Sequence, residues 1–209
     1  MSHGARNPPS VPDALLARCE ERARQLHPVS TEAFSRAVAE TSRIYTRSRD
    51  DIERFASSRW ALAARLGFFL PRDLLKVWGP LAALSRADAL PKRAEWRVLD
   101  LGAGLGATAL GAAHFAATSG AAERLSVTAV DRDAEALAEL SRLARDAASL
   151  GLVPVEAETR TSDLFSPASW RGGPFDLVLV GLALNETHDE EGAAALLRAL
   201  SKTLAPGGA

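Results

Sequence analysis

The chain has 209 residues, 47% hydrophobic and 24% charged, with a formal net charge of −1, a composition typical of a globular protein and not of a disordered chain. Its most apolar stretch, Leu66–Leu70, is flanked by Arg65 and Arg72, so we expect no membrane span. The N-terminus lacks the apolar core of a secretion signal, which favours a cytoplasmic location. Cys19 is the only cysteine, so the sequence excludes an internal disulfide, and we expect no metal site within this chain.

Charge is divided unevenly along the chain. Residues 1–93 carry a formal charge of +6 and residues 94–209 a charge of −7. A basic module of this kind can bind an anionic partner such as RNA, but two oppositely charged halves can also pack together or remain solvated. Because the basic half contains no lysine-rich run and no aromatic stacking motif, the second explanation is favoured.

The first part of the sequence, residues 1–93, is predicted to form a helical N-terminal region. The expected helices begin near Asp13, Ser30, Asp50 and Pro71. Ser30 is followed by Thr31 and Glu32, a pattern typical of a capped helix start. We expect Pro71 to open the last helix and Pro80 to kink or end it.

From about residue 94, predicted strands alternate with predicted helices. The strands are expected at 96–101, 125–130, 153–159 and 175–184, and the helices at 106–117, 134–150 and 190–204. This alternation predicts an α/β fold with a parallel sheet, and hence a second unit over residues 94–209. The chain ends in Pro206-Gly207-Gly208-Ala209, the usual approach to another strand, so we expect a chain truncated at its C-terminus with the last strands of the sheet missing.

The junction between the first predicted strand and its helix is the most informative segment. Asp100 stands near the end of the strand, and Gly102, Gly104 and Gly106 follow at alternate positions. A strand that ends in a tight turn before a helix directs free N–H groups of the helix toward a crevice, where nucleotides bind. Side chains at the three glycine positions would block such a ligand, so we expect this surface to be free of side chains.

Two classes of ligand fit this turn. A dinucleotide site requires G-x-G-x-x-G/A, which Gly102, Gly104 and Ala107 match, and it would make the protein an NAD-dependent oxidoreductase. Asp100 and the third glycine fit that motif less well, because a carboxylate beside a pyrophosphate is repulsive. A ligand that carries an ammonium and a sulfonium group would instead be attracted by the acid.

The turn resembles the first motif of the class I S-adenosylmethionine-dependent methyltransferases, an acid followed by G-x-G-x-G, here Asp100, Gly102, Gly104 and Gly106. The resemblance covers residues 95–208. It implies a Rossmann-like core with strand order 3-2-1-4, S-adenosylmethionine as the cofactor, and methyl transfer to a small-molecule or RNA acceptor that the sequence does not identify.

The resemblance also implies roles for residues that follow the other strands. Asp131 would hold the ribose hydroxyls of the cofactor, and Asp163 would accept the adenine amino group. Asn185 and Glu186 follow the fourth strand, where they would hold the acceptor, or Glu186 or His188 would act as a base. Each of these residues can instead serve only as a loop or helix-capping residue.

The Leu184-Asn185-Glu186 segment and the basic helical region resemble one subgroup, the methyltransferase-like proteins of small-ribosomal-subunit assembly. That subgroup carries clustered cysteines for an iron–sulfur site beyond the Pro-Gly-Gly element, where this chain ends. The uneven charge, together with the absence of the DPPY- or NPPY-type motif of base-methylating enzymes, motivates an alternative function, a non-catalytic factor with the methyltransferase fold that binds RNA or the small ribosomal subunit.

Overall fold

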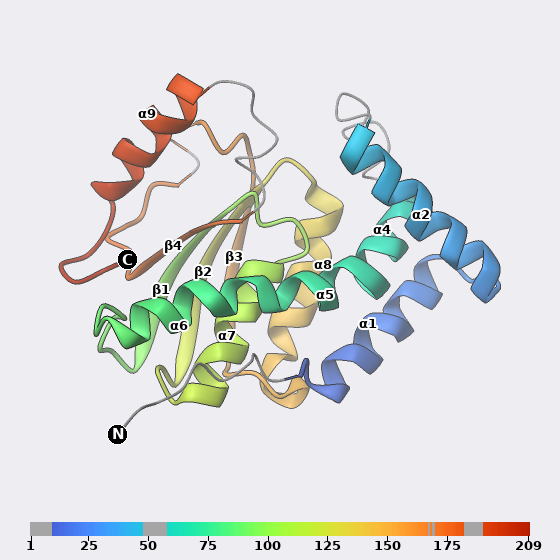
Figure 1. Ribbon diagram of the computed structural model, residues 1–209, viewed down its shortest axis with the longest axis horizontal. Helices are drawn as coiled ribbons and strands as arrows, with labels where there is room; N and C mark the ends of the chain where they lie inside the picture. Colours follow the sequence, from blue (N-terminus) through green and yellow to red (C-terminus); the bar gives the residue numbers. More distant parts are fainter. Residues whose placement is uncertain (1–9, 48–57, 167, 169, 182–189) are drawn as a thin grey trace.

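A four-stranded parallel sheet lies at the centre of the computed structural model, with helices on both faces (Figure 1). The structure describes residues 10–47, 58–166, 168, 170–181 and 190–209. None of the helices in these ranges is long and apolar enough to span a bilayer.

The predicted strand order 3-2-1-4 is confirmed, since the sheet runs β3-β2-β1-β4 with parallel neighbours. The strands are β1 Glu95–Leu101, β2 Arg124–Asp131, β3 Val155–Thr161 and β4 Leu177–Val180. β3 begins two residues later than predicted. Pro154 has no N–H to donate, and the N–H of Val153 donates to Ala113 O at 3.5 Å, so pairing with β2 starts at Val155.

Helices follow the strands along the chain. They are α7 Ala107–Ser119, α8 Ala134–Arg145, which continues into the short 3-10 helix η4 Ala147–Leu150, and α9 Glu190–Ser201. Asp133 is the N-cap of α8, where its carboxylate accepts the N–H of Ala136 at 3.0 Å. After α9, residues 204–209 return along β4, and the N–H of Val178 donates to Ala209 O at 2.9 Å.

The N-terminal part contains α1 Asp13–Leu26 and α2 Thr31–Arg47, both as predicted, and then a helical run. The run consists of α4 Arg59–Ala64, the π-helical turn η2 Arg65–Phe69, α5 Leu70–Leu74, the 3-10 turn η3 Leu75–Val77 and α6 Trp78–Arg86. The first part of the helix predicted to begin at Asp50 lies outside the described residues.

Pro71 lies in the first turn of α5, as predicted, but the helical run does not begin there, because it continues from residue 59. Pro80 does not end the run, which continues to Arg86. Each proline lies in the first turn after a change of helix type, where its missing N–H costs little. At the π-turn the N–H of Leu70 bonds to the carbonyl of Arg65, five residues earlier, so the hydrogen-bond register has shifted before Pro71 is reached.

The N-terminal helices share a hydrophobic core with one face of the sheet. Their contribution includes Leu15, Cys19, Leu66, Leu74 and Leu81, and that of the rest of the chain includes Trp96, Val98, Leu110, Leu137 and Leu140. The opposite face of β1 and β2 packs under α9 and the segment before β4, through Leu99, Leu101, Val130, Trp170, Leu196 and Leu200. Because side chains alternate along a strand, Asp100 lies on the face covered by α7.

Arginines of the N-terminal helices form ion pairs with acids spaced along α8, at its N-cap, its middle and its C-cap. The pairs are Arg65 with Asp133, Arg22 with Glu139 and Arg18 with Asp146. Part of the charge difference between residues 1–93 and 94–209 is therefore neutralised where the two parts meet.

Candidate functional site

The three acids selected from the sequence lie at or just beyond the carboxyl ends of three neighbouring strands, at one edge of the sheet. Asp100 lies near the end of β1, Asp131 ends β2, and Asp163 stands two residues beyond β3. Asp131 pairs with Thr161 in the register of β2 and β3, and the N–H of Ser162 donates to Asp131 O at 2.9 Å. The carboxyl edge of a parallel sheet is the usual position of a ligand site in α/β proteins.

Asp100 is fully buried, and its carboxylate is directed at the first turn of α7. Thr108 Oγ1 donates to the two carboxylate oxygens at 2.8 and 2.7 Å, and the N–H of Ala109 donates to Oδ2 at 3.1 Å. Burial raises the pKa of Asp100 to about 7, against the lowering effect of these hydrogen bonds, and the charge of Asp131 raises it further. Asp100 therefore stabilises the glycine turn by connecting the end of β1 to the first turn of α7.

The glycine turn folds back onto the acid at the end of β2. Gly102 has a positive φ of 67° and its N–H donates to Val130 O at 2.9 Å. The N–H of Gly104 donates to Asp131 Oδ2 at 2.7 Å, and the N–H of Asp133 donates to Asp131 Oδ1 at 2.8 Å. Two backbone donors thus fix the Asp131 carboxylate beside the turn.

The surface of this turn is less open than the sequence predicts. At Gly104, a Cβ atom would lie 3.3 Å from Arg65 Nη2 and 3.9 Å from Asp131 Oδ2. The expectation of a surface free of side chains is wrong at this point, because the ion pair with Asp133 holds the Arg65 guanidinium over the turn.

Gly106 is a glycine for a reason that the sequence analysis missed. A Cβ atom there would lie 2.2 Å from Cδ1 of Leu140, a fully buried residue of α8. Its φ of 82° is also a conformation that side chains rarely adopt. Gly106 allows α7 and α8 to pack closely, whereas the space beside Gly104 is polar.

Asp163 pairs with Arg132, and it also accepts the N–H of Phe165 at 2.9 Å. Partial burial tends to raise the pKa of Asp163, but the N–H of Phe165 and the Arg132 guanidinium together hold it below its ordinary value. The carboxylate stays ionised near neutral pH, so it acts as a hydrogen-bond acceptor.

The residues proposed to contact the acceptor or act as a base follow β4 in the sequence. Asn185, Glu186 and His188 lie outside the described residues. Within the ranges that are described, no group of three or more His, Cys, Asp or Glu side chains is arranged to hold a metal ion.

Arg65 is a residue of this site that the sequence analysis did not select. The sequence contained a sign of its role, because Arg65 is the one charged residue within the apolar run of residues 61–70. A charged side chain in a helix that becomes buried requires an acidic partner. The sequence could not identify that partner, which lies 68 positions away at Asp133.

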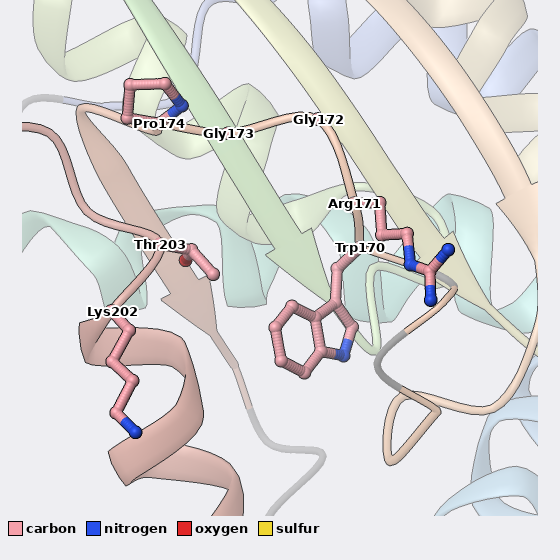
Figure 2. A pocket seen from close by; sticks show the side chains of 7 residues that line it. All are labelled: Trp170, Arg171, Gly172, Gly173, Pro174, Lys202 and Thr203. Atoms are coloured by element: carbon pink, nitrogen blue, oxygen red, sulfur yellow. The ribbon is translucent and has the colours of Figure 1, made fainter.

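A separate hollow of about 370 Å³ lies near the loop that leads into β4 and the turn after α9 (Figure 2). Its lining consists of Trp170, Arg171, Gly172, Gly173, Pro174, Lys202 and Thr203. None of the predicted site residues lines it, so the arrangement at the carboxyl edge of the sheet remains the candidate site.

Comparison with solved structures gives several similar chains. A S-adenosylmethionine-dependent methyltransferase from Leishmania major has 14% identity over 84% of this chain and 58% of its own, with a TM-score of 0.50. An arsenic(III) S-adenosylmethionine methyltransferase from Chlamydomonas reinhardtii has 30% identity over 57% of this chain and 38% of its own, with a TM-score of 0.41. The glycopeptide N-methyltransferase MtfA, solved with S-adenosylmethionine, has 20% identity over 65% and 51%, with a TM-score of 0.44.

This chain therefore spans 38% to 58% of the length of these three structures. No curated protein sequence matches it. The family model described as a methyltransferase domain matches residues 98–208, which is more than half of the chain and includes the glycine turn, Asp131 and Asp163. The chain belongs to the methyltransferase domain family.

Proposed function

We propose that the chain binds S-adenosylmethionine at the carboxyl edge of β1 and β2 and transfers its methyl group to an acceptor. The observation that carries this proposal is the 2.7 Å hydrogen bond from the N–H of Gly104 to Asp131, which joins the glycine turn and the acid of β2 into one site. The solved methyltransferases that resemble the chain include one determined with this cofactor, and the family match covers both elements.

Asp131 has the chemistry to hold a ribose. Each of its oxygens already accepts one backbone N–H, and an ionised carboxylate has about four acceptor positions in all. The remaining positions accept the two ribose hydroxyls through charge-assisted hydrogen bonds. Asp163, ionised and following the adjacent strand, accepts the adenine amino group.

The glycine turn takes the amino-acid end of the cofactor. Gly102 and Gly104 bring the backbone close to the ligand, while Asp100 and Gly106 hold the turn and α7 in position. The bound cofactor supplies an electrophilic methyl group on a sulfonium. For such a displacement, the residues of the chain have mainly to orient the reactants and exclude water.

The position of the methyl acceptor follows from the sheet. Asn185 and Glu186 are proposed to hold the acceptor molecule, because they follow β4, whose carboxyl end lies at the same edge of the sheet. Residues 1–93 are the proposed cap over this edge, since their helices share a core with α7 and their Arg65 reaches the glycine turn.

A non-catalytic factor that binds RNA or the small ribosomal subunit is the alternative. The basic N-terminal part motivated it, but the ion pairs of three of its arginines with acids along α8 weaken that argument. Salt-dependent RNA binding without methyl transfer would favour this alternative.

Isothermal titration calorimetry on the 209-residue chain tests the proposal. S-adenosylhomocysteine is expected to bind, whereas NADH is expected not to bind, because its diphosphate would need the N–H of Gly104 that Asp131 already accepts. Binding of NADH and no binding of S-adenosylhomocysteine would refute the proposal. Transfer of a labelled methyl group to total RNA or to a small-molecule extract then identifies the acceptor class.

A further inference from the structure

The glycine turn is covered by an arginine from the other half of the chain. Arg65 is the first residue of the π-helical turn η2, and its Nη1 donates to Asp133 Oδ2 at 2.5 Å. The Arg65 and Asp133 side chains are only 11% and 12% exposed. Because Asp133 is itself the N-cap of α8, the guanidinium is held at the start of that helix.

The other terminal nitrogen of this guanidinium lies beside the glycine turn of the proposed cofactor site. Arg65 Nη2 lies 3.3 Å from the position of a Cβ atom on Gly104, and Asp131 Oδ2 lies 3.9 Å from the same position. Gly104 also donates its N–H to that oxygen of Asp131. The guanidinium, the glycine and the carboxylate therefore border one small space.

The donors and acceptors around this space complement a sugar diol. An ionised carboxylate only accepts hydrogen bonds and a guanidinium only donates them, whereas each ribose hydroxyl does both. A hydroxyl that donates to Asp131 still has lone pairs that accept an N–H of Arg65. Asp131 and Arg65 together can satisfy both functions of the diol, which Asp131 alone cannot.

We infer that Arg65 contacts the ribose of the cofactor, so that the N-terminal region supplies one side of the cofactor site. This inference rests on the proposed function. It assigns Arg65 to the ribose and not to the carboxylate of the amino-acid end, because Nη2 shares the space beside Gly104 with the carboxylate of Asp131, the residue proposed to hold the ribose.

The test compares two ligands by calorimetry: S-adenosylhomocysteine and 5′-methylthioadenosine, which keeps the ribose and lacks the amino acid. Arg65→Ala is expected to weaken the binding of both ligands by a similar factor, about tenfold or more, the usual loss for a hydrogen bond from a charged donor.

The matched control is Arg22→Ala. Arg22 also ties an N-terminal helix to α8, through two 2.8 Å hydrogen bonds to Glu139, and it does not border the glycine turn. This control is expected to leave both affinities within about twofold.

Arg65→Lys serves as the second variant if the alanine variant does not fold. It keeps the charge opposite Asp133 but loses the planar fork that serves two acceptors at once, so both ligands are expected to weaken at least about threefold. Unchanged affinities, tighter binding or an equal loss in Arg22→Ala would overturn the inference, as would a loss confined to S-adenosylhomocysteine. A wild-type chain that binds neither ligand overturns the proposed function together with the inference.

Discussion

Gly111 marks a close approach between the N-terminal helical run and α7, and its replacement by alanine tests whether the two pack together. Gly111 lies within α7. A Cβ atom on it would lie 2.2 Å from the carbonyl oxygen of Leu74 and 2.7 Å from Val77 Cγ1. The first obstacle is backbone, so no rotation of a side chain relieves it, and the helical run would have to move away.

The expected loss of stability follows from two opposing effects. Alanine in place of glycine within a helix is favourable by about 1 kcal/mol. Overpacking a well-packed core, backbone shifts included, typically costs about 1–3 kcal/mol and occasionally more, and the upper end applies here because the first obstacle is backbone at 2.2 Å. We expect Gly111→Ala to lower the free energy of unfolding by about 2 kcal/mol, which corresponds to a fall of roughly 4–8 °C in Tm for a chain of this size.

Urea unfolding, followed by circular dichroism, measures this loss. Gly79→Ala is the control, because Gly79 is helical and a Cβ atom there meets nothing within 4 Å. Since Gly79 precedes Pro80, the gain in helix propensity is partly offset, and the change is expected to stay within about 1 kcal/mol. Equal stabilities for the two variants would show that the N-terminal run does not pack on α7 as described.

Three further predictions concern single side chains. Asp131→Ala is expected to weaken S-adenosylhomocysteine binding by about 1–3 kcal/mol in calorimetry, and an unchanged affinity would remove Asp131 from the site. Burial lowers the pKa of His114, so the unfolded chain takes up a proton below about pH 6.5 more readily than the folded chain does. In urea unfolding, the stability of the wild type should therefore fall more than that of His114→Phe when the pH is lowered from 7.5 to 5.5. The difference between the two is at most about 1.4 kcal/mol per pH unit, and equal falls would contradict the argument. Cys19 is buried, and burial raises its pKa to about 12, so a thiol reagent at pH 8 should react with it only as the chain unfolds; rapid labelling of the folded chain would contradict its position in the core.

The fold of residues 94–209 could be predicted because its signals are local. The apolar runs of β1 and β4 are typical of strands that are covered on both faces. The glycines after β1 show where the first crossover begins. The order β3-β2-β1-β4 came from the resemblance carried by the turn and the acids, and the structure confirms it.

The rest depended on partners that a sequence pattern does not reveal. Pro71 looked like a helix start because a proline normally interrupts the helical hydrogen bonds, and only the π-turn before it lets the run continue. Gly106 looked like part of a ligand surface, although the residue that requires a glycine there is Leu140, which is distant in sequence. Arg65 was noted only as a charge beside an apolar run, because its contact with Asp133 exists only in the folded chain.

The charges at the turn bear directly on which ligand it favours. A purely acidic turn would attract a cationic sulfonium and repel a diphosphate, but Arg65 adds a positive charge beside Gly104. Asp131 and Asp133 still outnumber that single guanidinium, even when Asp100, with its pKa of about 7, is protonated. The N–H of Gly104 is moreover already bonded to Asp131, so a diphosphate would have to displace a carboxylate from it. On this balance of charge, we expect the turn to favour a cationic ligand over a diphosphate.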